Sequence, residues 1–480
     1  MNQKLPWVFS GFFLGVLIGS FLVFGWVLPV FILLLAVFCA CLWLIFSREQ
    51  IYFLSAVFLL AMSVGVARLE WSGTDRNITP SGDQAIVIDE PTAGENSVRY
   101  VTQIGETKVL IVTGSDTHFK YGDVLKYFGK IKPVSDTYLN KDDIYYEMVF
   151  PKLALINKGE GNWLQARLFV VKNWFNANIA RLVPEPESSL AGGLVLGAKE
   201  SLGKDLLNKF RVAGLVHIVV LSGYNITIVA LSIMWLFSKF LSKRTSVVAG
   251  IVSIILFAIM VGAGATVIRA SVMAILGLLA QVSGRTSEVA RALVIAALLM
   301  VAINPKLLVF DIGFQLSFLA TLGLIYLEPI FKPHFSWLPN RVLWFPIRDI
   351  ASATLGAQLA VFPLILYTFG NFSVYAFPLN MLVLPLVPTV MLLVFLVGVL
   401  VPIPFLSLLA YPIAWVTYAL LAYMIALVRL VAHLPFASLQ FDNVPIFLIM
   451  IIYAGLIYLV LKFNKKEQHL GVGSPSGQNP

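Results

Sequence analysis

His217 and Ser222 are two side chains whose types could support nucleophilic chemistry. They lie with Gly223 and Asn225 in the apolar run LVHIVVLSGYNITIV, which begins at Leu215. A hydroxyl beside an imidazole can form a nucleophilic pair, but a spacing of five residues is poor for contact on a helix, and no acidic side chain lies nearby in the run. Ser-Gly followed by Tyr-Asn is typical of a turn, so we expect a broken helix whose polar groups face a cavity or a neighbouring helix.

Arg269 is the most unusual polar residue, because it stands within the mostly apolar run GAGATVIRASVM. A guanidinium keeps its charge inside a membrane, so it must line an anion path or pair with a carboxylate. The candidate partner is Asp311, which lies with Gln315 and Ser317 in NPKLLVFDIGFQLSF. Asp311 is near the expected start of a helix, where a carboxylate can also cap the helix and is favoured by its dipole. Pore-lining and structural interpretations both remain open.

Polar residues and prolines also interrupt two later apolar runs. Gln358 precedes Pro363, and Asn380 lies in a proline-rich stretch that includes Pro385. This density of prolines predicts irregular backbone, which a membrane protein tolerates where the backbone lines a cavity. The five histidines are isolated, and no zinc spacing, P-loop or GxSxG motif occurs. We therefore expect no metal site and no cofactor.

The composition places these residues in a membrane protein. Of 480 residues, 59% are hydrophobic and 12% are charged, about half the usual charged share of a soluble domain. Many separate apolar runs are long enough to cross a bilayer, so we expect an α-helical polytopic protein of about twelve transmembrane helices. Cys39 and Cys41 would lie on different faces of one helix, which favours neither a disulfide nor a metal pair.

Changes in residue composition and hydropathy pattern divide the chain into five parts. Residues 1–69 hold three apolar runs, and residues 70–161 hold short β-like segments. An amphipathic helix and a basic helix are expected at the membrane surface over 162–214, a core of transmembrane helices over 215–462, and a disordered tail over 463–480. Lys and Arg gather at alternate ends of the spans, which predicts that both termini lie in the cytoplasm and residues 70–161 lie outside.

The β-like region predicts a small all-β, OB-like extracytoplasmic domain. Its alternating, β-branched runs, bounded by turn residues, are 84–88, 98–104, 108–113, 124–131 and 145–156. OB folds often bind single-stranded nucleic acid. Between Glu70 and Gly161, however, ten Lys and Arg oppose fourteen Asp and Glu, a net charge of −4 that argues against strong nucleic-acid binding. A structural role is at least as well supported.

Four stretches, taken in order along the chain, resemble the ComEC-type competence family of inner-membrane DNA uptake channels. The first is LVHIVVLSGYN, the second is GATVIRASVMA, and the third and closest is NPKLLVFDIGFQLSF. Later residues that fit the family are Gln358, Pro363, Asn380 and Pro385. The resemblance covers about residues 184–388. Asn225 departs from the pattern, because many members carry a second histidine there.

The resemblance implies a channel that passes single-stranded DNA into the cytoplasm during natural transformation and does no covalent chemistry. It also implies that the membrane is the cytoplasmic (inner) membrane. The implied partners are the DNA strand, membrane lipid, and the DNA receptor and cytoplasmic motor of the competence machinery. Polar groups in broken helices would keep water in the path, and basic side chains would guide phosphates. The residues expected along the path are His217, Ser222, Gly223, Asn225, Arg269, Asp311, Gln315, Ser317, Gln358 and Asn380, with Lys199, Lys204, Lys209 and Arg211 as a basic guide segment.

Full-length members of the family usually end in a metallo-β-lactamase-like domain, and no such metal motif follows Leu461. The resemblance therefore implies that this chain has no nuclease activity of its own and is not an enzyme. Two alternatives stay open. One is a secondary transporter for a small anion, in which Arg269 would bind a carboxylate or phosphate. The other is a membrane-embedded serine hydrolase that uses Ser222 and His217.

Overall fold

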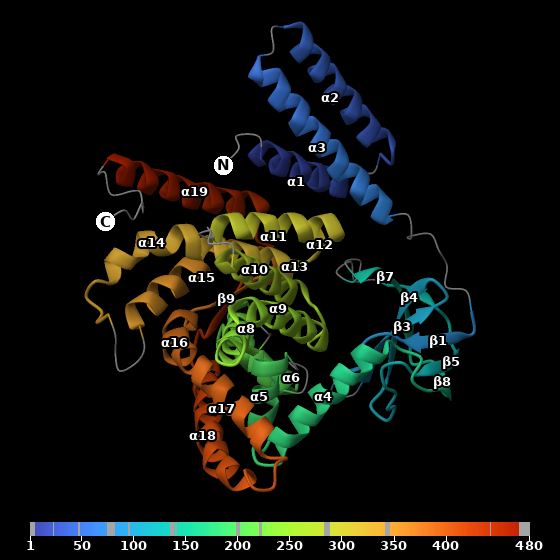
Figure 1. Cartoon of the computed structure of the whole chain (residues 1–480), viewed down its shortest axis with the longest axis vertical. Helices are drawn as coiled ribbons and strands as arrows, with labels where there is room; N and C mark the ends of the chain where they lie inside the picture. Colours follow the sequence, from blue (N-terminus) through green and yellow to red (C-terminus); the bar gives the residue numbers. More distant parts are fainter. Residues whose placement is uncertain are drawn as a thin grey trace. The chain divides into compact units, whose positions relative to one another are not determined.

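A computed structural model gives the fold in two compact units. The first unit comprises Met1–Trp174 and Ile226–Gln315, and the second comprises Phe175–Asn225 and Leu316–Pro480. The structure describes the chain except for residues 1–4, 23, 47–48, 74–81, 95–96, 135–138, 140–141, 198–201, 220–222, 283–288, 341–345, 442 and 470–480. Each unit is described separately below, and Figure 1 labels their elements.

Three helices open the first unit: α1 (Leu5–Phe21), α2 (Val27–Ile45) and α3 (Gln50–Gly73). Helices α1 and α3 pack through glycines, so closely that a Cβ placed on Gly15 would overlap the carbonyl oxygen of Met62. Gly65 of α3 meets the backbone of α1 in the same way. Lipid provides no hydrophobic force between helices, so small residues that let backbones approach are the expected source of stability.

A mixed β sheet follows these helices. Its strands are β1 (Gln84–Val87), β2 (Thr92–Ala93), β3 (Ser97–Ile104), β4 (Thr107–Gly114), β5 (Val124–Phe128), β6 (Lys132–Pro133), β7 (Ile144–Val149) and β8 (Lys152–Asn157). Their order is β6-β7-β4-β3-β1-β5-β8, with β2 beside β3. Alternate residues point inward, and Tyr100, Ile111, Leu125 and Met148 belong to the buried core. All five predicted β-like runs lie on strands of this sheet.

The last predicted strand is divided into two by the residue Phe150. Phe150 has a φ of 51°, outside the extended range, and its N–H donates to Val112 O at 2.7 Å. Before this break, β7 pairs in parallel with β4; after it, β8 pairs antiparallel with β5. One continuous run of sequence therefore contributes to two separate ladders of the sheet.

The rest of the first unit is helical. Helix α4 (Trp163–Ala180) leaves the sheet and continues into the second unit along the chain. Helices α8 (Gly223–Ser238), α9 (Lys243–Met260), α10 (Ala265–Val282), α11 (Val289–Ile303), α12 (Leu307–Phe310) and α13 (Ile312–Leu322) follow later. Ser242 caps α9 by accepting a hydrogen bond from Thr245 N, and α10 packs against both α9 and α11.

The second unit is built around a short buried helix, α5 (Glu187–Leu196), which contacts α7 (Val216–Val219), α17 (Val387–Leu400) and α18 (Ser407–Ala432). The other elements are α6 (Lys204–Val212), η4 (Gly323–Leu327), α14 (Glu328–Phe331), η5 (Lys332–Phe335), α15 (Ile347–Phe369), β9 (Asn371–Ser373), α16 (Ala376–Val383), η6 (Leu384–Leu386), β10 (Ser438–Gln440) and α19 (Ile446–His469). Figure 1 shows α17 and α18 side by side, as their packing requires.

Two sequence predictions need correction in this unit. All ten residues of α5 are buried, whereas the sequence predicts only an amphipathic helix and a basic helix at the surface over 162–214, with no buried helix between them. The small residues of α5, which include Gly192 and Gly193, allow the other helices to pack closely around it. Residues 463–469, which the sequence predicts as part of a disordered tail, belong to α19, which continues to His469 through residues with good helix propensity. Residues 470–480 lie outside the described part of the chain.

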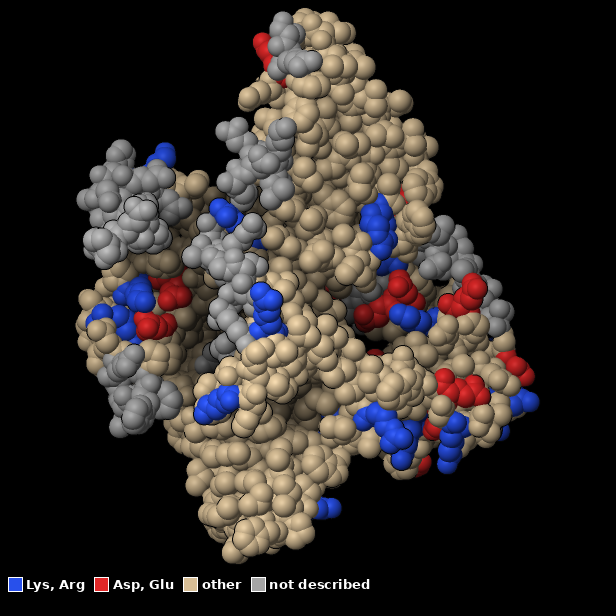
Figure 2. Space-filling model, in the orientation of Figure 1, with Lys and Arg blue, Asp and Glu red and all other residues tan. Residues whose placement is uncertain are grey.

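Seven helices among the described residues are long and apolar enough to cross a membrane. They are Val27–Ile45, Gln50–Ser72, Ile312–Phe335, Ile347–Phe369, Ala376–Leu400, Ser407–Ala432 and Ile446–Phe463. The described residues also contain five shorter apolar helices. The face drawn in Figure 2 is mostly uncharged, and many of its acidic and basic side chains gather over the β sheet. The protein is thus a mostly helical, polytopic membrane protein, as the sequence predicts, while the count of twelve spans stays a prediction.

Candidate functional site

In the second unit, Asn225 ties the start of α8 to the buried helix α5. Its side chain is 1% exposed, and its Nδ2 donates to Leu194 O at 3.1 Å. His217 lies on α7 and is exposed, whereas Gly223 is the first residue of α8. Ser222 and the predicted helix break fall on residues 220–222, outside the described residues. Of the four polar positions in this stretch, Asn225 therefore has a defined structural contact.

Asn380 lies at a polar corner of the second unit, where the turn between α6 and α7 meets β9 and α16. Gly214 has a φ of 73° there, and a Cβ on it would lie 3.0 Å from Ser373 Oγ and 2.5 Å from Ala376 Cβ. Asn380 follows Ala376 by one helical turn, so both residues lie on the same face of α16. Asn380 is 1% exposed. Within the described residues, its Oδ1 has no hydrogen-bond partner, and neither do Ser373 Oγ and Asn371 Oδ1.

These three atoms make the corner a place where water or a ligand is needed. A buried polar atom without a hydrogen bond carries a penalty of roughly 1–3 kcal/mol, so such atoms are normally satisfied by protein or by ordered water. Strand β9 also pairs with β10, with Phe372 opposite Leu439. The corner therefore combines a short strand pair with these three unsatisfied side-chain atoms next to apolar spans.

In the first unit, Arg269 is buried near the start of the apolar helix α10 (Ala265–Val282). Its side chain is 8% exposed, and Nη1 lies 3.4 Å from Met273 Sδ, one turn along the same helix. A sulfur atom is a weak hydrogen-bond acceptor, so the contact with Met273 contributes little on its own. The positive charge thus lies among apolar helices, where it can attract an anion strongly.

Asp311 and Gln315 hold the elbow between α12 and α13. Asp311 Oδ1 accepts a hydrogen bond from Phe314 N at 2.9 Å, which is the capping contact expected from the sequence. Gln315 Nε2 donates to Leu308 O at 3.0 Å and to Val309 O at 2.9 Å. These carbonyls belong to α12, so the Gln315 amide satisfies groups that its short helix leaves open.

Ser317 and Gln358 belong to the second unit. Ser317 is buried on α13, and its carbonyl oxygen accepts a hydrogen bond from Thr321 Oγ1 at 2.9 Å. Gln358 is half-buried on α15, two residues after Gly356. A Cβ on Gly356 would lie 2.9 Å from Glu328 N, so α15 and α14 approach closely at that point. Small residues at such crossings are typical of membrane helix pairs.

The basic guide segment lies on α6. Lys209 Nζ pairs with Asp205 Oδ2 at 2.6 Å, one turn away, and Arg211 Nη1 donates to Asn208 Oδ1 at 2.6 Å. Lys204 is the first residue of α6, and Lys199 lies outside the described residues. The local carboxylate offsets part of the positive charge that the sequence predicts for this helix.

The predicted path residues divide between the two units. Arg269, Asp311 and Gln315 belong to the first, whereas His217, Asn225, Ser317, Gln358 and Asn380 belong to the second. Within the units, the structure places Asp311 and Gln315 in one elbow. A single route that joins all of these residues remains a prediction.

The comparison with protein families decides the affiliation of the chain. The model of the family described as Competence protein matches residues 194–466, more than half of the chain. The chain belongs to the Competence protein family. The matched residues begin at the end of α5 and run into α19, so they include every predicted path residue.

One curated relative of this Competence family protein is ComE operon protein 3 of Bacillus subtilis (strain 168). The two sequences are 24% identical over 205 residues, which is 42% of this chain and 25% of the relative. The match thus spans about a quarter of the relative's length. No solved structure matches the chain.

Lys306 is a residue of this Competence family protein that the sequence analysis missed. It follows Asn-Pro in the third family stretch, and its side chain is 2% exposed. Its Nζ lies 2.5 Å from Asp143 Oδ1 and 2.7 Å from Tyr145 OH, both on the β sheet domain. A lysine between two apolar runs was the available signal, but its partners are more than 160 positions earlier in the sequence.

Proposed function

We propose that the chain forms an inner-membrane channel that passes single-stranded DNA into the cytoplasm during natural transformation. Membership of a competence family and similarity to a ComE operon protein support a role in DNA uptake. The membrane-spanning helices support a location in the inner membrane. Family membership favours neither the small-anion transporter nor the serine hydrolase.

The observation that carries the channel proposal is the polarity buried among apolar spans of the family region. Arg269 places a permanent positive charge inside α10, and Asn380 places an unsatisfied oxygen inside α16. Lipid cannot satisfy buried polar groups, so such groups in membrane helices usually face a partner side chain, a watery path or a substrate. A DNA strand carries one negative charge per phosphate, which suits a buried guanidinium.

The proposed topology has both termini in the cytoplasm and the β domain outside. In the first unit, Arg68 near the end of α3 donates to Ala302 O at 2.8 Å and also to Ile303 O at the end of α11. The two helix ends therefore share one side of the membrane, which agrees with the charge rule. In the second unit, β9 pairs with β10, so the ends of α15 and α18 also share one side.

An OB-like fold for the β domain is part of the proposal. Its support is the strand order, in which β1 lies between β3 and β5 while β7 pairs in parallel with β4. The channel itself would make and break no covalent bonds. A DNA receptor outside and a motor in the cytoplasm would deliver the strand and supply the energy, as the family resemblance implies.

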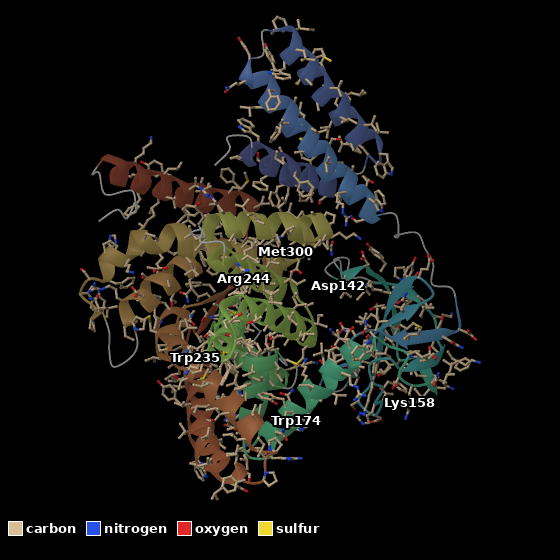
Figure 3. All side chains as sticks on the ribbon, in the orientation of Figure 1. Asp142, Lys158, Trp174, Trp235, Arg244 and Met300 are labelled. Carbon is tan, nitrogen blue, oxygen red and sulfur yellow. The ribbon has the colours of Figure 1, made fainter. Side chains whose placement is uncertain are left out.

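Uptake of labelled DNA by cells tests this proposal. Deletion of the gene should abolish uptake and transformation, and Arg269→Ala should lower uptake by roughly tenfold or more, because a buried charge that offsets phosphate is lost. Arg244→Ala is the matched control. Arg244 is exposed at the start of α9 (Figure 3), and this change should leave uptake unaltered. Unchanged uptake in Arg269→Ala cells with normal protein levels would contradict the proposal.

A further inference from the structure

The β domain contacts the rest of the first unit at two separate places. At α4, Lys172 Nζ pairs with Glu90 Oε2 at 2.6 Å, and the Tyr121 ring packs edge-on against Phe169. At the turn between α11 and α12, the contact is made by Lys306. Figure 3 labels Met300 on α11 and Asp142 next to β7, which lie on the elements that meet there. The α4 ion pair joins residues 82 positions apart, and the Lys306 contact joins residues 163 positions apart.

Lys306 is buried, so its charged ammonium group needs a counter-charge and hydrogen-bond partners. A lysine ammonium without a counter-charge is strongly disfavoured away from water. Asp143 supplies the charge, and Tyr145 supplies a second oxygen from the same strand end. Asp143 has a φ of 61°, which aspartate and asparagine adopt more readily than most residues. The partners thus come from the tight turn that begins β7.

The turn that carries Lys306 is itself fixed on both sides. Asn304 Oδ1 accepts a hydrogen bond from Lys306 N at 3.1 Å, and Pro305 restricts the backbone between them. Before the turn, Arg68 holds the last carbonyls of α11. A displacement of this turn would therefore disturb helix ends as well as the loop.

After the turn, polar contacts continue to the start of α13. Helix α12 follows Lys306 directly, and the Gln315 amide binds its carbonyls. The Asp311 cap fixes the first turn of α13. Hydrogen bonds and short rigid elements thus lead without interruption from the β domain to a membrane-spanning helix.

We infer that Lys306 is the docking residue that fixes the β domain on the α11–α12 turn and so sets the position of the α12–α13 elbow. The occupant of this docking site is the turn before β7, through Asp143 and Tyr145. If the chain is a DNA channel, the docked domain hands the strand to the helices beside this elbow. The docking contact does not depend on that function; the handover rests on it.

Cross-linking in the full chain tests the docking. Cysteines replace Lys306 and Asp143 in a chain that carries Cys39→Ala and Cys41→Ala, and a short bifunctional thiol reagent is added to membranes. The pair should cross-link within the chain. In the control pair, Lys152→Cys replaces Asp143→Cys; Lys152 lies beyond the far end of β7, a strand about 20 Å long. A failure of the first pair to cross-link, or equal linking of both pairs, would overturn the docking.

DNA uptake tests the coupling to the elbow. Lys306→Met should lower uptake by roughly tenfold, because Asp143 and Tyr145 lose their partner. The exchange Lys306→Asp with Asp143→Lys should recover part of that loss. Should Lys306→Met reduce the amount of protein, Asp143→Asn and Tyr145→Phe weaken the Lys306 contact less severely. For these two variants, a severalfold decrease in DNA uptake is expected. Lys332→Met, at an exposed ion pair, is the matched control.

The outcomes separate this inference from the proposed channel. Efficient cross-linking with normal uptake in Lys306→Met, Asp143→Asn and Tyr145→Phe cells would overturn the coupling and keep the docking. Normal uptake after deletion of the gene, or in Arg269→Ala cells, would overturn the channel, while the cross-link would still report the docking. A loss that the charge exchange restores supports both docking and coupling.

Discussion

The α1–α3 pair and the elbow between α12 and the first turn of α13, both within the first unit, are held together by opposite means. Glycines bring the backbones of α1 and α3 into direct contact, with no ion pair at the crossing among the described residues. The elbow depends on directed hydrogen bonds that the side chains of Gln315 and Lys306 donate and that of Asp311 accepts. Close packing gives an interface that tolerates no added volume, whereas hydrogen bonding gives one that tolerates no lost partner.

The largest expected effect comes from adding volume between α1 and α3. Gly15→Ile would drive its side chain into the Met62 carbonyl, and neither backbone can yield without separating the helices. We expect a loss of about 3 kcal/mol or more, together with lower protein levels. Thermal unfolding in detergent measures it. Gly277→Ile on α10, where no atom lies within 4 Å of a built Cβ, is the control and should change little.

Removing the Gln315 amide should have the next largest effect. Gln315→Leu keeps the volume but leaves the carbonyls of Leu308 and Val309 without this donor. A cost of about 1–3 kcal/mol is expected, seen as a lower unfolding temperature. If Gln315→Leu proves as stable as the natural protein, the elbow does not depend on hydrogen bonds and the contrast with α1–α3 fails.

Asp311 separates the structural role of a side chain from the role of its charge. Asp311→Ala should cost about 1 kcal/mol through loss of the cap, whereas Asp311→Asn should retain it. The unfolding temperature of the two variants measures this difference. DNA uptake then tests the charge: lower uptake in Asp311→Asn cells of normal stability would show that the carboxylate does more than cap α13.

The smallest effect is expected at the exposed ion pair of Lys332 and Asp349. Nζ and Oδ1 are 2.8 Å apart, but both side chains are about half exposed. Exposed pairs contribute less than about 1 kcal/mol and weaken in salt. Lys332→Ala should therefore shift the unfolding temperature barely, and by less at high ionic strength. A shift as large as that of Gln315→Leu would contradict the ranking.

Much of the secondary structure could be predicted because local patterns determine it. The alternating run 98–104 forms β3, and the apolar run that ends near Phe369 forms α15, which terminates at Gly370 with a φ of 58°. The Asp311 cap was also visible as a carboxylate before a helical run. In each case the signal and the structure lie within a few residues of each other.

Features that depend on distant partners could not be predicted in this way. The Lys306 contact joins residues that are 163 positions apart, and the Lys172 contact joins residues 82 positions apart. The burial of α5 follows from helices that come later in the chain. The glycine interface was different, because Gly11, Gly15 and Gly19 recur every four residues, a pattern typical of close helix pairs that the sequence analysis overlooked.

The small ribbon of β9 and β10 has a consequence for how the C-terminal helices are joined. It fastens residues 371–373 to 438–440, at the two bases of the segment that contains α16, α17 and α18. The pairing of β9 with β10 therefore holds the two ends of that segment together, and the ends cannot separate while these strands stay paired. A protease cut in the turn 401–406 should leave two fragments that stay associated and migrate together in native electrophoresis. They should separate only when a denaturant breaks the pairing of β9 with β10.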